Sequence, residues 1–174
     1  MIGLGTAIGG AVAIAAVSTL GDFIWATAIP QHRPLYGLTH GTLLLLCVGL
    51  YLGMRAHKPI LGAWAGALIG LLAAASFYVL APMAGYSAMF PSWIGLWVAL
   101  GLVNGRVLHT QAGTREVLAR GMAAAVASGI VFYAISGIWL PFRPRGWDYL
   151  LHFGAWTVAY LPGFAALLVT RRSV

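Results

Sequence analysis

The sequence predicts an all-α, polytopic integral membrane protein, folded as one transmembrane domain over residues 1–174 with six membrane-spanning helices. Two features of its composition favour this class: hydrophobic residues make up 61% of the chain, and charged residues only 7%. Soluble domains carry about 25% charged residues, and at this size they leave too much surface in water to hide so many apolar side chains. The third observation is that the apolar residues form long runs without charge, as a bilayer requires.

The charge-free runs set the number of spans, because a helix needs roughly 20 apolar residues to cross the hydrocarbon core. Runs without Asp, Glu, Lys or Arg cover residues 1–21, 34–54, 59–105, 121–142 and 149–170. The third run has 47 residues, which is enough for two spans and a turn. We therefore predict helices near 4–28, 35–54, 60–81, 91–108, 121–140 and 148–169.

Local signals support the ends of these helices. Residues 1–32 contain no Lys or Arg, so the first helix lacks the positive segment of a signal peptide and is expected to be retained. Gly85 and Pro91 lie near the middle of the longest run and predict the turn between the third and fourth helices. The longest hydrophilic connection, 106–120, is predicted to be a loop in which Thr114 caps a short helix.

The distribution of Lys and Arg predicts the orientation of the bundle. With six spans, the termini share one side of the membrane. That side carries seven basic residues: Arg55, Lys58, Arg106, Arg115, Arg120, Arg171 and Arg172. The other side carries three: Arg33, Arg143 and Arg145. Because cytoplasmic loops are enriched in Lys and Arg, we expect both termini in the cytoplasm and place the protein in a cell membrane, most simply a bacterial inner membrane.

Glycines predict close helix packing. Gly62, Gly66 and Gly70 recur every four residues on the third helix, so they share one face on which a neighbouring backbone can approach closely. Gly5 and Gly9 line the first helix in a similar way. The face on the third helix is expected to pack within the chain, or to dock a second copy or a partner membrane subunit.

Ionisable residues collect near the outer ends of the predicted helices. The set comprises Asp22, Arg33, His40, Arg143, Arg145, Asp148 and His152. At a rise of about 1.5 Å per residue, the aspartate in the first helix and the two histidines fall at similar depth. A carboxylate in hydrocarbon costs about 2.5–3.5 kcal/mol on insertion scales, and such residues are functional candidates by default. We therefore predict a polar ligand pocket open to the outer side.

Two interpretations of this set remain open. In the functional one, Asp22 is a counter-charge or proton carrier, the three arginines contact an anion, and the two histidines line the pocket. In the structural one, Asp22 forms an ion pair with Arg33 or Arg143 that fixes the first helix to an outer loop.

Aromatic residues gather at the same level. Near the outer interface lie Trp25, Tyr36, Tyr86, Phe90, Trp93, Trp139, Trp147 and Tyr149. They are expected to form an aromatic belt or, alternatively, the wall of a pocket for a flat or cationic ligand. Trp64 and Trp97 lie nearer the inner half and are expected to be packing residues.

The leading functional hypothesis is binding or transport of a small solute, with no cofactor assigned. One alternative is a membrane redox protein or enzyme in which His40 and His152 hold haem, a quinone or, with Asp22, a metal. Against this alternative, no closely spaced metal motif occurs, and Cys47 is the single cysteine. A third hypothesis is a structural subunit of a membrane complex. The chain has neither a phosphate loop nor a nucleophile motif, so a role as an enzyme is less favoured.

The overall plan is similar to that of the substrate-binding subunits of energy-coupling-factor uptake systems. The likeness covers chain length, six helices with both ends inside, and small residues on the first helix. It implies binding of a small molecule near the outer face and association with partner subunits, and it assigns no binding residue. Nucleic acid is not an expected partner despite the net charge of +7, because the basic residues sit in short loops between apolar runs.

Overall fold

The computed structural model of the chain describes residues 3–28, 34–108, 113–139 and 145–169, apart from the side chains of 136–139. Six long helices account for most of these residues. They are α1 (Leu4–Ala28), α2 (Pro34–Arg55), α3 (Pro59–Ala84), α4 (Met89–Leu102), α5 (Thr114–Trp139) and α6 (Asp148–Leu168). A 3-10 turn, η1 (Gly85–Ala88), joins α3 to α4, and a π-helical segment, η2 (Val103–Leu108), continues α4.

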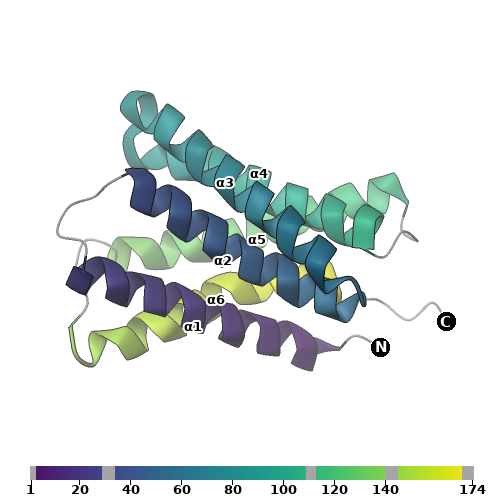
Figure 1. The fold of residues 1–174 in the computed structure, drawn as a ribbon, viewed down its shortest axis with the longest axis horizontal. Helices are drawn as coiled ribbons and strands as arrows, with labels where there is room; N and C mark the ends of the chain where they lie inside the picture. The colour runs from purple at the N-terminus through teal and green to yellow at the C-terminus, as the bar shows by residue number, and fades with distance from the viewer. Residues whose placement is uncertain (1–2, 29–33, 109–112, 140–144, 170–174) are drawn as a thin grey trace.

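The helices form a closed ring in one bundle. Helix α2 packs along α3, α4 along α5 and α5 along α6, and α6 closes the ring by packing along α1. The start of α1 and the end of α6 lie at the same end of the bundle (Figure 1).

The described residues contain five segments that are long and apolar enough to cross a membrane, which fits a multi-pass membrane protein. The third segment, Pro59–Leu108, has 50 residues and contains α3, η1 and α4. It folds back on itself, because the hydroxyls of Ser76 and Ser92 lie 2.8 Å apart. In one straight helix these residues, 16 positions apart, would be separated by about 24 Å. Gly85, with φ of +57°, occupies the bend, where its missing Cβ avoids strain.

The backbones of α2 and α3 approach each other closely at glycines, as the spacing of these glycines predicts. A Cβ added to Gly66 would collide with the carbonyl of Leu45 and with the backbone of Gly49. A Cβ on Gly70 would collide with the carbonyl of Gly41. The glycine face of α3 is thus occupied by α2, so docking of another subunit there would require the two helices to separate.

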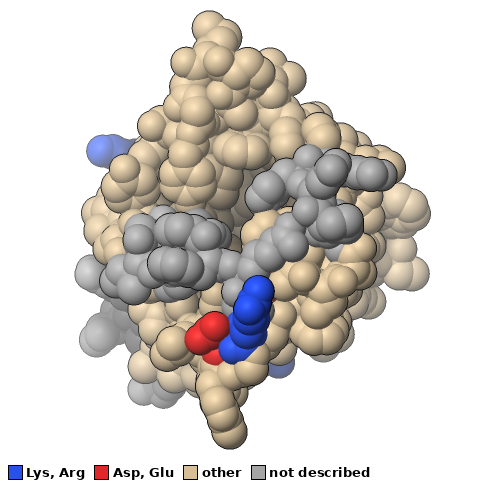
Figure 2. Space-filling model, turned by 90° about the vertical axis from the view of Figure 1, so that its left-hand side faces the viewer, with Lys and Arg blue, Asp and Glu red and all other residues tan. Residues whose placement is uncertain are grey.

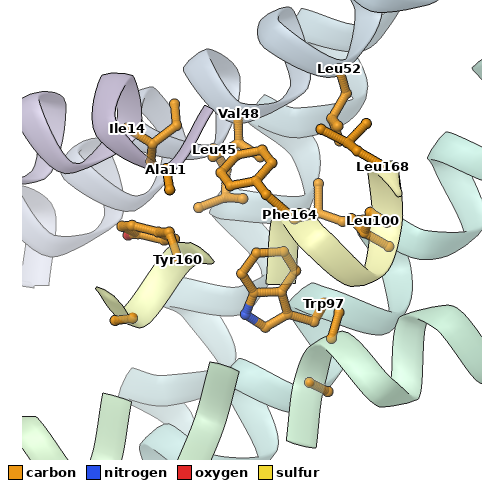
Figure 3. Close-up of a cluster of buried hydrophobic side chains, with 14 of the residues drawn as sticks. Ala11, Ile14, Leu45, Val48, Leu52, Trp97, Leu100, Tyr160, Phe164 and Leu168 are labelled. Atoms are coloured by element: carbon orange, nitrogen blue, oxygen red, sulfur yellow. The ribbon is translucent and has the colours of Figure 1, made fainter. Parts of the chain in front are cut away.

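Large side chains fill the centre of the ring (Figure 3). Phe164 of α6 lies between Trp97 of α4 and Val48 of α2, and all three are at most 1% exposed. The rings of Trp97 and Phe164 meet edge to face with centroids 6.1 Å apart. Gly163 makes room for Trp97, because a Cβ there would collide with the indole. Trp97 is therefore a packing residue, as expected.

Two sequence expectations are corrected. Trp64 is not a packing residue of the bundle, because it is 74% exposed; an apolar ring on the outside of a membrane bundle can face lipid. Helix α5 begins at Thr114, earlier than the expected residue 121. The early turns carry charge, but Glu116 lies in the first turn, where the helix dipole favours an acid, and pairs with Arg120 at 2.8 Å. Most of the predicted loop is therefore helical.

Candidate functional site

Asp22 of α1 points toward α6 and accepts two hydrogen bonds on a single oxygen. Its Oδ2 atom lies 2.8 Å from Nε1 of Trp156 and 2.9 Å from Nδ1 of His152. The indole nitrogen can only donate, so this bond runs toward Asp22; the bond with His152 runs the same way when Nδ1 carries the proton and the carboxylate is ionised. The side chain of Asp22 is 20% exposed and that of His152 only 6%. The two charge-assisted bonds compensate for placing a carboxylate at this depth.

The partners of α1 form one stripe on α6. His152, Trp156 and Tyr160 follow each other at intervals of four residues, so they lie on the same face of the helix. One turn before Asp22, the fully buried Ser18 donates a 3.2 Å hydrogen bond to the hydroxyl of Tyr160. Helix α1 therefore holds the polar ends of all three side chains and leaves the ring faces of Trp156 and Tyr160 for other contacts.

Those ring faces belong to an aromatic wall contributed by three helices. Trp93 of α4 stacks on Phe132 of α5 with centroids 4.6 Å apart and planes at 18°. Phe132 in turn stacks on Trp156 at 5.5 Å and 27°. Trp156 stacks on Tyr160 at 5.7 Å and 23°. The four rings thus form a continuous, nearly parallel series within the distances that favour aromatic contacts.

A cavity of about 220 Å³ lies against this wall, inside the ring of helices. All four rings of the wall line it. Small residues of α2 and α3 also line the cavity: Gly37, Gly41, Gly70, Ala73 and Ala74. Because these residues carry little or no side chain, they leave the space that larger residues would fill. The result is a chamber with aromatic rings on α4, α5 and α6, and with small residues beside larger ones such as Leu45 and Phe77 on α2 and α3.

His40 is a polar residue at the edge of the cavity. Its ring stacks on Tyr36 at 5.7 Å and packs against Gly21, where a Cβ would collide with the imidazole. The hydroxyl of Tyr36 donates a 2.6 Å hydrogen bond to the carbonyl of Gly21 and so fixes this corner. Within the part of the chain that the structure describes, neither ring nitrogen of His40 has a hydrogen-bond partner. The imidazole therefore lines the cavity with hydrogen-bonding capacity that no described residue uses.

Other hydroxyl groups border the same space. Ser92 lines the cavity. Its hydroxyl hydrogen-bonds with the hydroxyl of Ser76 and also contacts the carbonyl of Ala88 as a donor. Tyr78 lines it from α3, with its hydroxyl close to Gly37. Most of the lining is nonetheless carbon. The chamber suits a mostly apolar molecule that carries one or two polar atoms.

The structure separates the residues that the sequence placed in one site. His40 lines the cavity, whereas Asp22 and His152 meet at the α1–α6 interface and are not among the lining residues. Arg33 and Arg143, the arginines expected beside Asp22, lie outside the described residues. Among the described residues, the hydrogen-bond partners of Asp22 are His152 and Trp156.

Arg145 and Asp148 lie at the exposed start of α6. The backbone N–H of Arg145 donates a 3.0 Å hydrogen bond to Oδ2 of Asp148, a contact of the kind that satisfies the free amides at a helix start. Seen from this end, the described surface is mostly uncharged, and acidic and basic atoms lie next to each other in one place (Figure 2). These two residues do not line the cavity.

The site residues that sequence reasoning missed are mainly small or aromatic. Gly37, Ala73 and Phe132 carry no polar atom on their side chains, so no charge pattern could indicate them. Trp93 was placed among the interfacial aromatics, for which a pocket wall was the alternative to a belt, and it lines the cavity. Trp147, from the same group, is 83% exposed, as a belt residue would be.

The alternative of a metal held by Asp22, His40 and His152 finds no support in the geometry. Among the described residues, which include these three, no group of three or more His, Cys, Asp or Glu side chains is close enough to hold a metal ion.

Comparison with models of known protein families, with curated proteins and with solved structures finds no significant match. The function therefore has to be argued from the site itself.

Proposed function

We propose that this protein is a six-span membrane protein with cytoplasmic termini that binds a small, flat, mostly apolar solute in the chamber beside His40. The observation that carries the proposal is the combination of an open volume, a stacked aromatic wall and an imidazole to which no described residue gives a hydrogen bond. Binding of this kind is also the first step that transport of such a solute would need.

The volume limits the size of the solute. An engineered cavity of about 150 Å³ holds benzene, whereas pockets for drug-sized ligands begin at about 300 Å³. A chamber of about 220 Å³ lies between these values. It therefore favours a molecule of one or two rings.

The lining sets the chemistry of the solute. The parallel rings of Trp93, Phe132 and Trp156 offer a face on which a planar molecule can stack. His40 can donate or accept one hydrogen bond, which would orient a hydroxyl or carbonyl group on that molecule. No Lys or Arg is among the described residues that line the cavity, so a neutral solute is favoured over an anion.

Equilibrium dialysis of the purified protein in mild detergent tests the proposal. The probes are naphthalene and 1-naphthol, which differ by one hydroxyl group. The matched variants are Ala73→Leu, which fills the chamber, and Ala127→Leu, which adds the same atoms at an exposed position of α5. Because both probes partition into micelles, only a saturable difference between the two variants reports the cavity.

We expect the wild type and Ala127→Leu to bind both probes saturably, and Ala73→Leu to bind neither. His40→Leu should lose the preference for 1-naphthol over naphthalene. Equal probe binding by Ala73→Leu and Ala127→Leu would refute the chamber as a binding site.

A quinone is the second candidate, because His40 beside an aromatic slot can donate a hydrogen bond to a quinone carbonyl. Dialysis with menadione, a two-ring quinone, distinguishes quinone binding from binding of the solute proposed above. Tighter saturable binding of menadione than of 1-naphthol, lost in His40→Leu, would favour the redox function.

A further inference from the structure

We propose that Asp22 is a positioning residue: it sets the orientation of Trp156 in the cavity wall and so controls binding without contacting the bound molecule. This inference rests on the proposed function and deepens it. It differs from the sequence hypothesis, in which Asp22 meets the ligand as a counter-charge.

The geometry places Asp22 behind the wall. Trp156 lines the chamber with its ring, whereas its Nε1 atom is held at 2.8 Å by Asp22, which does not line the chamber. Rotation of the indole about its side-chain bonds would break this hydrogen bond and leave a carboxylate less compensated within the bundle. Asp22 therefore opposes the rotation.

The orientation of Trp156 matters because its ring contacts two other rings of the wall. Its plane lies at 27° to that of Phe132 and at 23° to that of Tyr160. A turned indole would disrupt both contacts and intrude into the chamber. Asp22 thus keeps the wall flat by fixing Trp156. Selection of a planar molecule depends on this flat wall.

The effect of the acceptor's position can be tested apart from the effect of its charge, because a single oxygen of Asp22 accepts both hydrogen bonds. Asparagine can place its Oδ1 atom where Oδ2 of Asp22 lies, and so keep both hydrogen bonds without the negative charge. Leucine has similar size and keeps neither bond. A positioning role predicts that Asn rescues binding and Leu does not.

The experiment measures 1-naphthol binding by dialysis and near-ultraviolet circular dichroism, which reports ordered aromatic rings. The variants are Asp22→Asn, Asp22→Leu and Trp156→Phe, which keeps Asp22 and His152 paired but lacks the indole donor. Tyr51→Phe is the control, because it removes the α1 contact of Tyr51 with Thr6 and leaves Asp22 and Trp156 in place.

We expect Asp22→Asn and Tyr51→Phe to bind like the wild type and keep the tryptophan bands of its near-ultraviolet spectrum. Asp22→Leu and Trp156→Phe should bind about tenfold more weakly, the change that one hydrogen bond to a charged group carries. Equal loss in Asp22→Asn and Asp22→Leu would show that charge is required and overturn the proposal. Undiminished binding in Trp156→Phe would overturn it as well, even if Asp22→Leu did not fold.

Failure of the proposed function would be recognised separately. If the wild type bound no probe, the spectra would still decide the role of Asp22. A spectrum altered in Asp22→Leu and intact in Asp22→Asn would support positioning of Trp156, and identical spectra for the wild type and Asp22→Leu would contradict it.

Discussion

Asp22 and Trp156 lie 134 positions apart in the chain, yet the carboxylate of the first accepts a 2.8 Å hydrogen bond from the indole of the second. The contact links the first helix to the last and closes the ring. It also joins the polar and apolar parts of the site, because the same indole forms the surface of the chamber. The helix that carries the acid therefore supports the cavity from outside.

Ser18 and Tyr160 should also be energetically coupled, because their side chains share one hydrogen bond between α1 and α6. Ser18→Ala and Tyr160→Phe each remove the 3.2 Å hydrogen bond between their hydroxyls. We expect each to lower the free energy of unfolding by about 1 kcal/mol and the double variant to lose little more, because both changes delete one shared interaction. Thermal unfolding in detergent measures the cycle. Fully additive losses would mean that the hydroxyls do not stabilise each other.

The glycine contact between α2 and α3 predicts a position-dependent cost for a single methyl group. In Gly66→Ala the added Cβ points at the carbonyl of Leu45. Because a backbone carbonyl cannot move aside easily, the substitution should destabilise the bundle by about 1–3 kcal/mol. Gly95→Ala is the control, since nothing lies within 4 Å of a Cβ added there. The unfolding temperatures of the two variants are compared in the same detergent. Equal temperatures would rule out the close approach of α2 and α3.

Two tyrosines of α2 join it to α1 at widely separated points. Tyr36 donates to the carbonyl of Gly21, and Tyr51 donates to the carbonyl of Thr6, each at 2.6 Å. Phenylalanine at either position should cost about 0.5–1.5 kcal/mol.

The double variant Tyr36→Phe/Tyr51→Phe should show the sum of the two losses. The tyrosines are 15 positions apart on one helix, or about 22 Å, and sites so distant act independently. Unfolding followed by circular dichroism gives the three values. A double loss well below the sum would indicate that α1 and α2 separate as a unit once one contact is gone.

The helices could be predicted from the sequence because the bilayer imposes a simple rule: charged residues end the apolar runs. Where another effect acts, the rule fails. Helix α5 starts at Thr114 rather than near 121 because Glu116 and Arg120 stabilise a charged turn outside the apolar run.

The site was only partly predictable. Depth along a helix follows from residue number, so Asp22 and His152 were expected at one level, and their side chains meet. Depth does not give the rotation of a helix about its axis, so the sequence could not separate His40, which lines the chamber, from His152, which does not. The chamber itself is a space left by small residues, and such a space has no pattern in one sequence.

The proposed topology predicts which positions are accessible from each side of the membrane. In a Cys47→Ser background, three exposed positions each receive one cysteine: Ser87→Cys in η1, Trp147→Cys before α6 and Thr114→Cys at the start of α5. If α3 and α4 each cross the bilayer and the termini are cytoplasmic, positions 87 and 147 face the outside. A membrane-impermeant maleimide should then label these two in intact cells and label position 114 only after permeabilisation.

Each departure from this labelling pattern has a specific meaning. Labelling of position 114 alone in intact cells would invert the orientation and contradict the count of basic residues. Protection of position 87 in both conditions, with 147 and 114 on opposite sides, would show that the α3–α4 turn does not reach the outer surface and that this hairpin re-enters the membrane. Labelling of 87 and 147 from outside, with 114 protected, requires α3 and α4 to be separate crossings, because a re-entrant hairpin cannot place the turn between them in water.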